Sequence, residues 1–244
     1  MQTAVEIFRR TTNRRAMSPR LPHPAVALAM ALVGLALCAP LAAKEPANLY
    51  LLKQEVRAYV DSGEYDAEIA RVAAEATTWL EQRVLVTNSA RNEPGGRLAA
   101  VFDIDETLLS NLPHMRAMDF GYVPASWDAW VRDGKAPSIK PVCELFRTAR
   151  RLGVTIFILS GRREADRPGT EKNLQADGIA GYAGLYFKPD GSTGSTEAFK
   201  TAWRRKIAAD GYTIILNIGD QESDLAGGYA ERTFKLPDPF YLTQ

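Results

Sequence analysis

Two aspartates one residue apart, Asp103 and Asp105, directly follow a short apolar run in the segment AAVFDIDETLLSN at residues 99–111. The apolar run is suited to a buried strand, and alternation along that strand would point both carboxylates the same way. Two carboxylates at the end of a buried strand are costly unless a cation meets them. The pair therefore predicts half of a site for a hard divalent cation such as Mg²⁺, which prefers oxygen ligands.

Polar residues also follow two further apolar runs of the sequence. Ser160 follows the run VTIFIL, while Asp220 and Asp224 follow the run YTIILNI. In an open α/β sheet, ligands bind in the crevice outside the carboxyl ends of the strands, so groups that are distant in sequence can converge there. Lys200 is one position away from the apolar stripe of a predicted helix, so it can face the same crevice.

These residue types are the ones that phosphoryl transfer to a carboxylate requires. A metal ion offsets the repulsion between an attacking carboxylate and a phosphoryl group, while a hydroxyl and a cationic side chain hold the equatorial oxygens. An aspartate nucleophile divides hydrolysis into the formation and the breakdown of an aspartyl phosphate. A second carboxylic acid can give a proton to the leaving alkoxide and then take one from the attacking water.

The elements that must position these groups alternate between helices and wholly apolar strands. We expect strands at residues 99–102, 154–159, 185–187 and 212–218, and helices at residues 139–151, 164–177 and 195–209. Strands that are apolar throughout and alternate with helices are typical of a parallel sheet covered on both faces. The sequence therefore predicts an α/β fold, a three-layer parallel sheet within residues 97–244.

Two segments are predicted to add to this core. Residues 44–96 carry helical signals at 48–61 and 64–86, which predict an N-terminal helical hairpin packed against the core. Residues 112–137 form an insertion with one short helix, placed to lie over the mouth of the site. Its aromatic side chains could stack on an organic leaving group or pack inward, and we expect inward packing for at least one tryptophan. These residues are Phe120, Tyr122, Trp127 and Trp130.

The first 43 residues have the pattern of a targeting segment. Five arginines and one acid precede an apolar stretch at residues 25–39. A basic start followed by an apolar run that ends near small residues predicts a secretory signal peptide, cleaved after Ala43, and so an exported, periplasmic or extracellular protein. An uncleaved anchor stays open as an alternative, because residues 25–43 just reach spanning length. A retained leader is the one membrane contact that we expect.

Charge and cysteine content exclude several classes of function. The chain has 244 residues, enough for one good-sized domain with a small appendage. The formal net charge is +1, and removing the five arginines and one acid of residues 1–43 makes it −3, which does not fit binding to a nucleic-acid polymer. Cys38 lies in the leader and Cys143 fits a buried position, so we expect no disulfide. His114 is expected to be a solvated loop residue.

The order of the motifs resembles that of the haloacid dehalogenase (HAD) superfamily: D-x-D-E-T-L-L-S-N, then S-G-R, a helical lysine and G-D-Q-x-S-D-L. The pattern is most similar to the class B-type acid phosphatases of subfamily IIIB, a group with plant acid phosphatases, vegetative storage proteins and bacterial exported acid phosphatases. The resemblance extends over residues 48–244 and includes the ending RTFKLPDPFY. It implies a HAD-like Rossmannoid core with a small cap insertion, and magnesium-dependent hydrolysis of small phosphomonoesters.

The resemblance also implies roles for individual residues. Asp103 would be the nucleophile and Asp105 the general acid and base. The residues that would bind the phosphate are Ser160, Lys200 and Arg162. The Mg²⁺ ligands would be Asp103, Asp105 through its backbone carbonyl, Asp220 and Asp224.

Alternatives stay open for three of these residues. Arg162 could form a structural salt bridge instead of binding phosphate. Asp224 could orient the site rather than ligate the metal. Lys200 is one of several cations on its helix, and Arg205 and Lys206 are nearby candidates for the same role.

Two other functions compete with hydrolysis. One is a catalytically weak storage or binding protein of the same family, and the intact Asp103 counts against it. The other is phosphotransfer to an alcohol, which uses the same aspartyl phosphate and the same residues.

Overall fold

The computed structural model describes residues 45–89 and 97–243. The expected signal peptide or anchor lies outside these residues. Within the described ranges, none of the helices is both long and apolar enough to span a bilayer. Residues Ala47–Gln244 form one compact unit, and all the elements described below belong to it.

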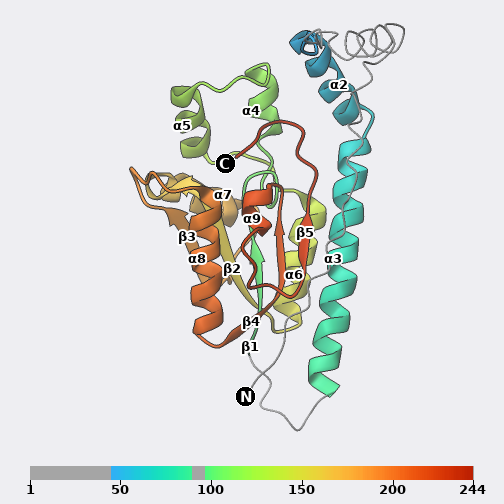
Figure 1. The fold of residues 1–244 in the computed structure, drawn as a ribbon, viewed down its shortest axis with the longest axis vertical. Helices are drawn as coiled ribbons and strands as arrows, with labels where there is room; N and C mark the ends of the chain where they lie inside the picture. Colours follow the sequence, from blue (N-terminus) through green and yellow to red (C-terminus); the bar gives the residue numbers. More distant parts are fainter. Residues whose placement is uncertain (1–44, 90–96, 244) are drawn as a thin grey trace, which may run out of the picture. The chain divides into compact units, whose positions relative to one another are not determined.

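Five parallel strands form the central sheet in the order β3-β2-β1-β4-β5 (Figure 1). They are β1 (Arg97–Phe102), β2 (Thr155–Arg163), β3 (Gly184–Lys188), β4 (Tyr212–Gly219) and β5 (Thr233–Lys235). The apolar runs predict the first four strands to within a few residues. They miss β5, because it has three residues and only Phe234 among them is buried. A strand so short has too few apolar positions to stand out in a sequence.

Helices cover both faces of the sheet, as the three-layer prediction requires. The main ones are α3 (Glu64–Ser89), α6 (Lys140–Arg151), α7 (Arg167–Ala176) and α8 (Thr196–Ala209). Alternate residues of β1 face different layers: Ala100 and Phe102 pack in the core formed with α3 and α6, while Ala99 and Val101 pack in the core formed with α8. The two-residue period of a strand thus divides the apolar residues of one run between two cores.

The N-terminal helices α2 (Leu49–Asp61) and α3 meet at Gly63, which has a positive φ of 81°. α3 packs on the core, and its Trp79 indole donates to the Ile215 carbonyl of β4 at 2.8 Å. α2 contributes no buried residue and makes ion pairs with Asp119 of the insertion. In Figure 1, α3 leads away from the end of α2 rather than back along it. The pair is therefore more open than the expected hairpin.

The insertion holds two short helices, α4 (Leu112–Ala117) and α5 (Pro124–Asp133). The sequence predicts α5 and misses α4, because six residues are too few for a helical period to show. His114 lies on α4, where it is buried and stacked on Trp130 with ring centroids 5.5 Å apart. The expectation of a solvated loop histidine is therefore wrong.

The register of β1 and β4 brings the ends of these strands together. Phe102 pairs with Ile218, and the Asp103 N–H continues the ladder by donating to the Ile218 carbonyl at 3.0 Å. Asp220 follows β4 by one residue and so emerges beside Asp103 at the same edge of the sheet.

Candidate active site

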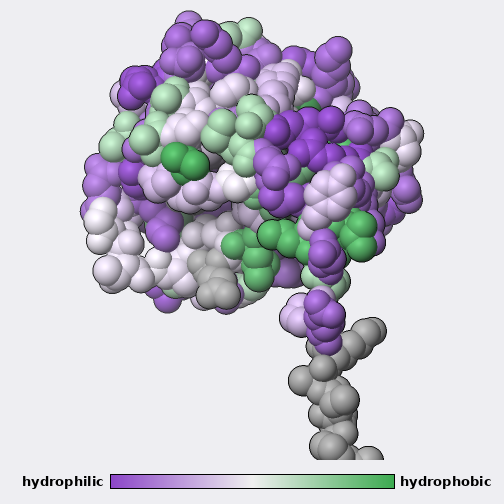
Figure 2. All heavy atoms as spheres, turned by 90° about the horizontal axis from the view of Figure 1, so that it is seen from above, coloured by the Kyte–Doolittle hydropathy of each residue, from purple (hydrophilic) through white to green (hydrophobic). Residues whose placement is uncertain are grey.

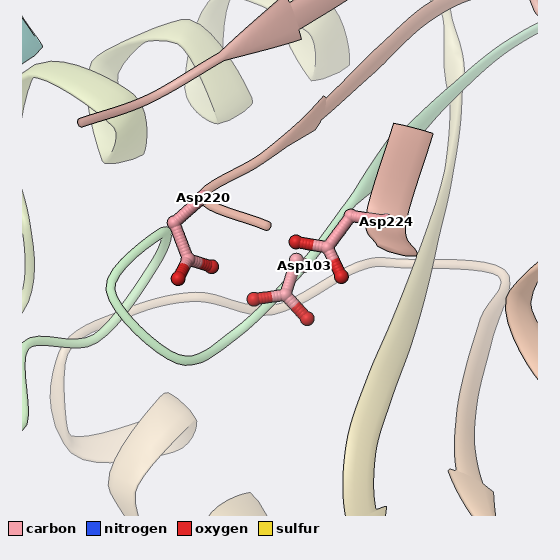
Figure 3. A group of neighbouring side chains, drawn as sticks. All are labelled: Asp103, Asp220 and Asp224. Atoms are coloured by element: carbon pink, nitrogen blue, oxygen red, sulfur yellow. The ribbon is translucent and has the colours of Figure 1, made fainter. Parts of the chain in front are cut away.

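Three carboxylates converge at the carboxyl ends of β1 and β4. Asp103 follows β1, Asp220 follows β4, and Asp224 lies on the short helix α9 (Glu222–Leu225). Their side chains point toward one another (Figure 3), and one oxygen from each lies within 4.8 Å of the other two. All three residues are buried. The structure thus brings together the three aspartates that the sequence analysis assigned to one metal site.

Asp105 faces the same crevice as Asp103, as the alternation along an extended chain predicts. Both aspartates line one cavity, whereas Ile104 between them is fully buried in the core.

Lys200 reaches the carboxylates from α8. Its side chain is buried, and its Nζ donates to Asp103 and, at 2.6 Å, to Oδ1 of Asp224. The other two helix cations, Arg205 and Lys206, are exposed. Of the three cations considered from the sequence, Lys200 is therefore the one that meets the nucleophile candidate.

Arg204, four residues after Lys200, holds the loop that carries Asp224. It is fully buried, and its guanidinium donates to the backbone carbonyls of Asp224 at 2.5 Å, Gly228 at 3.0 Å and Ala226. Lys200 therefore binds the carboxylate of Asp224, whereas Arg204 binds its backbone carbonyl. No sequence pattern indicates this contact, because its acceptors are backbone atoms.

The acidic cluster holds more negative than positive charge. Burial raises the pKa of Asp103 to about 7, although Lys200 acts in the opposite direction and Asp224 adds to the rise. Burial and the neighbouring Asp103 also raise the pKa of Asp220 well above its ordinary value. Ionised carboxylates in this place lack sufficient positive charge within the protein, and a divalent cation would supply it.

The donor set fits Mg²⁺. Buried carboxylate oxygens are the ligands that hard cations prefer. Oxygens on opposite sides of one Mg²⁺ are about 4 Å apart, so a spacing within 4.8 Å needs only small side-chain rotations. Asp224 fits an orienting role better than a direct bond to the ion, because its Oδ1 accepts from Lys200 and its Oδ2 from the Gln221 N–H at 2.9 Å.

Asp105 has a different partner from Asp103. Arg162, at the end of β2, donates to Oδ1 of Asp105 from Nη2 at 2.7 Å and from Nε at 3.0 Å, and Asn111 donates to the same oxygen at 2.7 Å. Burial by itself would raise the pKa of Asp105, but Arg162 and Asn111 outweigh it and hold this pKa below its ordinary value. Nη1 of Arg162 donates to Thr170 at 2.9 Å. These contacts favour the salt-bridge alternative for Arg162.

Ser160 is fully buried, while the next residues of the chain line the cavity. Its Oγ accepts the N–H of Arg162 at 3.1 Å, which orders the turn at the end of β2. Thr196, at the start of α8, lines the cavity opposite Gly161 and was missed by the sequence analysis. It follows the helix cap Ser195, and a first-turn threonine has no distinctive sequence signal.

Glu106 is a buried acid with no role predicted from the sequence. Its φ is +51°, which is uncommon for a residue with a side chain. Its Oε1 accepts from the Asn111 N–H at 2.5 Å and its Oε2 from the Asn111 amide at 2.9 Å, so the two residues close the loop after β1. Burial, together with the charge of Asp105, raises the pKa of Glu106 to about 8.

A cavity of about 380 Å³ lies over the strand ends. Figure 2 looks onto this end of the molecule, where hydrophobic residues (green) form small groups among hydrophilic ones. Phe120, Tyr122 and Trp127 of the insertion line the cavity. Trp130 instead packs inward and donates to Asn111 at 2.8 Å, which is the inward packing expected for one tryptophan.

Residues 236–243, called here the C-terminal segment, form part of the cavity wall. Phe240, Tyr241 and Thr243 line the cavity, a position that was not predicted from the sequence. The segment has neither a regular period nor a motif of known chemistry, so its position could not be inferred from the residues.

A family model described as HAD superfamily, subfamily IIIB (Acid phosphatase) matches residues 37–244. Acid phosphatase 1 of Solanum lycopersicum is 34% identical over 191 residues, which cover 76% of this chain and 72% of that protein. Vegetative storage protein 1 of Arabidopsis thaliana is 33% identical over 145 residues, which cover 58% of this chain and 54% of that protein. In fold, the class C acid phosphatase from Bacillus anthracis is similar, with a TM-score of 0.58 at 23% identity over 79% of this chain and 86% of that chain.

The family match spans the sheet, the insertion and the C-terminal segment, and it contains the carboxylates, the lysine and the cavity described above. The relative from Solanum lycopersicum extends the similarity over most of both chains. The chain therefore belongs to the HAD superfamily, subfamily IIIB, and is a phosphomonoesterase of the acid phosphatase type.

Proposed function

We propose that this phosphatase is exported, depends on Mg²⁺ and hydrolyses small phosphomonoesters through an aspartyl phosphate on Asp103. The observation that carries the proposal is the buried cluster in which Asp103 contacts Lys200 and lies within ion-sharing distance of Asp220. A carboxylate at the floor of a cavity, with a cation beside it, meets the requirements for attack on a phosphoryl group.

Two steps complete the reaction. In the first, a carboxylate oxygen of Asp103 bonds to phosphorus, the bond from phosphorus to the ester oxygen breaks, and Asp105 gives its proton to the leaving oxygen. In the second, Asp105 takes a proton from water, the water oxygen bonds to phosphorus, and the bond to Asp103 breaks. The products are an alcohol and inorganic phosphate, and both aspartates return to their starting forms.

Asp105 begins this cycle as an acid, yet Arg162 favours its ionised form. The protonated fraction of Asp105 is therefore small near neutral pH and grows as the pH falls. The raised pKa of Asp103 acts in the opposite sense, because its nucleophilic carboxylate form grows as the pH rises, so the pH profile of the rate reports both aspartates.

The phosphoryl oxygens are proposed to contact Lys200 and the Ser160 hydroxyl, while Arg162 stays paired with Asp105. Ser160 accepts a backbone N–H, so its own hydroxyl hydrogen is available to donate. Asp103, Asp220 and the backbone carbonyl of Asp105 would hold the Mg²⁺. Bound there, Mg²⁺ supplies the positive charge that offsets the repulsion between the carboxylates and the phosphoryl group.

The leaving group is proposed to lie against the aromatic wall of the cavity. Tyr122 is largely exposed at its mouth, and the Trp127 ring lies deeper, with the Arg162 guanidinium 5.6 Å from its centroid. An open cavity with flat apolar surfaces suits organic leaving groups of varied shape, nucleoside 5′-monophosphates included.

Export is proposed from the basic and apolar pattern of residues 1–43. The mass of the protein recovered from outside the cytoplasm tests it. A chain that begins at Lys44 supports cleavage, whereas a full-length, membrane-bound chain supports the anchor, and retention in the cytoplasm contradicts export.

The decisive experiment measures turnover of p-nitrophenyl phosphate by the wild-type chain and by Asp103→Asn, with Mg²⁺ and with chelator. We expect chelator to abolish wild-type turnover, and Asp103→Asn to lower kcat on the order of 10⁴-fold or more, the scale for loss of a covalent nucleophile. Asp66→Asn, which alters an exposed aspartate on α3, serves as the matched control.

Equal turnover in the wild type and Asp103→Asn would exclude the mechanism. A wild-type chain with no turnover on a panel of nucleotides, sugar phosphates and aryl phosphates would favour the storage alternative. Added alcohols that divert phosphate from water would show phosphotransfer.

A further inference from the structure

The C-terminal segment crosses the carboxyl ends of the strands (Figure 1). It starts where the Leu236 N–H donates to the Gly219 carbonyl of β4 at 2.9 Å. Phe240 then packs edge-on against Tyr65 of α3, with ring centroids 5.2 Å apart, and stacks at 6.0 Å on Phe120 of the insertion. Three parts of the chain that are distant in sequence therefore hold this segment over the site.

Gln221 connects the C-terminal segment to Asp220. Its Nε2 donates to Oδ2 of Asp220 at 2.8 Å and also to the Asp238 carboxylate. Its Oε1 accepts the Thr243 N–H at 3.0 Å. One buried amide is thus bonded at one end to the acidic cluster and at both ends to the segment.

Tyr241 brings a second donor to the same carboxylate oxygen. Its hydroxyl lies 3.3 Å from Oδ2 of Asp220 and 3.5 Å from Oε2 of Glu106. A tyrosine hydroxyl is neutral near neutral pH, so it keeps its hydrogen for donation.

We propose that Tyr241 is a positioning residue for the cation site, which acts with Gln221 to hold Oδ2 of Asp220 and so to orient this carboxylate toward the ion. This inference rests on the proposed function, because it takes Asp220 to be a Mg²⁺ ligand. A carboxylate that ligates through one oxygen is oriented by donors to its other oxygen, and loss of such a donor weakens metal binding. The mechanism itself makes no use of the Tyr241 hydroxyl.

The hydroxyl can be removed without disturbing the wall that the ring helps to form. Tyr241→Phe keeps the ring in the cavity lining and deletes the hydroxyl that lies beside Asp220 and Glu106. If Tyr241 serves merely as packing, this change leaves the affinity for Mg²⁺ as it is. If Tyr241 positions Asp220, the affinity falls while the fold persists.

Calorimetric titration of Mg²⁺ into the full chain measures the affinity directly. We expect Tyr241→Phe to raise the Kd for Mg²⁺ about tenfold, with the thermal midpoint of the metal-free chain unchanged. The Mg²⁺ concentration for half-maximal turnover of p-nitrophenyl phosphate should rise by the same factor. Tyr50→Phe, at an exposed tyrosine of α2, is the matched control and should keep the wild-type Kd.

A second variant tests whether the two donors act on one oxygen. Gln221→Leu should also weaken Mg²⁺ binding, and the losses in the double variant should not add, because both donors hold Oδ2 of Asp220. Strictly additive losses would overturn the shared role.

Two outcomes separate this inference from the proposed function. An unchanged Kd in Tyr241→Phe overturns the inference and leaves the proposed function intact. A wild-type chain that binds no divalent cation in the calorimeter overturns both.

Discussion

Asp103 and Asp105 are identical residues two positions apart at the end of the same strand, but their surroundings differ. Asp103 clusters with Asp220 and Asp224, and Lys200 contacts Asp103 and Asp224. The pKa of Asp103 is raised, mainly by burial, to about 7. Asp105 faces Arg162, whose guanidinium outweighs the effect of burial and keeps the pKa of Asp105 low. The comparison shows that partners contributed by other elements, rather than residue type or depth alone, set the protonation of each carboxylate.

The difference also separates two roles. The cluster around Asp103 has three carboxylates and one lysine, which suits the binding of a cation next to the nucleophile Asp103. The Asp105 side is neutralised within the protein, which suits proton exchange without a metal bond from its side chain. Changes near Asp103 should therefore act on stability and metal binding, whereas changes near Asp105 should act on proton transfer.

Asp105→Asn should have the largest effect on turnover after Asp103→Asn. Loss of the proton donor and acceptor lowers kcat by about 10²- to 10⁴-fold, while Mg²⁺ affinity stays near that of the wild type because Asp105 is assigned to the ion through its backbone. Steady-state kinetics and calorimetry measure the two quantities. An unaltered kcat would refute the acid and base role of Asp105.

Lys200→Met should destabilise the Asp103 side. The change leaves two buried carboxylates without their cation, and breaking a buried ion pair in this way costs about 3–5 kcal/mol. Urea denaturation in chelator measures the loss. Lys206→Met removes an exposed ion pair with Asp210 and should cost about 1 kcal/mol or less, so equal losses in the two variants would contradict the buried pairing.

The stability of the metal-free chain should fall as the pH rises toward 8. Asp103 has a folded pKa of about 7, above its ordinary value of 3.8, so its contribution to stability is present at low pH and is lost as the pH rises through 7. Asp105 has a lowered pKa and acts in the opposite sense, since its contribution is lost in acid.

Thermal midpoints measured in chelator from pH 4 to pH 8 test this prediction. Asp103→Asn should reduce the fall in midpoint between about pH 4 and pH 7. Mg²⁺ should stabilise the wild-type chain more at the higher pH, because ligation requires ionised carboxylates. A wild-type profile that matches that of Asp103→Asn would remove the contrast between the two aspartates.

Arg162→Gln should have the smallest effect on the maximal rate and should move the pH profile. Without the guanidinium the pKa of Asp105 rises, so the protonated acid persists to higher pH and the optimum shifts upward. The dependence of kcat on pH measures the shift. An unchanged optimum, or a rise in KM alone, would indicate that Arg162 acts on the substrate instead.

Much of the fold follows from local patterns. Apolar runs and helical periods predict β1 to β4, α3, α6 and α8, because each of these elements is long enough to bury a distinct set of residues. The same patterns miss α4 and β5, which are short and depend on their neighbours. They also predict an N-terminal helical hairpin but not its opening, since periodicity describes each helix but gives no angle between helices.

The sequence by itself determined which residues could do chemistry: the aspartates at two strand ends, the serine and arginine after a third strand, and one lysine on a helix. Their side-chain types and local spacing carry that information. Only the tertiary structure decided that Lys200 meets Asp103, that Arg162 meets Asp105, and that the hydroxyl of Tyr241 lies beside Asp220. Those contacts join residues far apart in the chain, and they depend on strand register and on long-range packing, which no local pattern encodes.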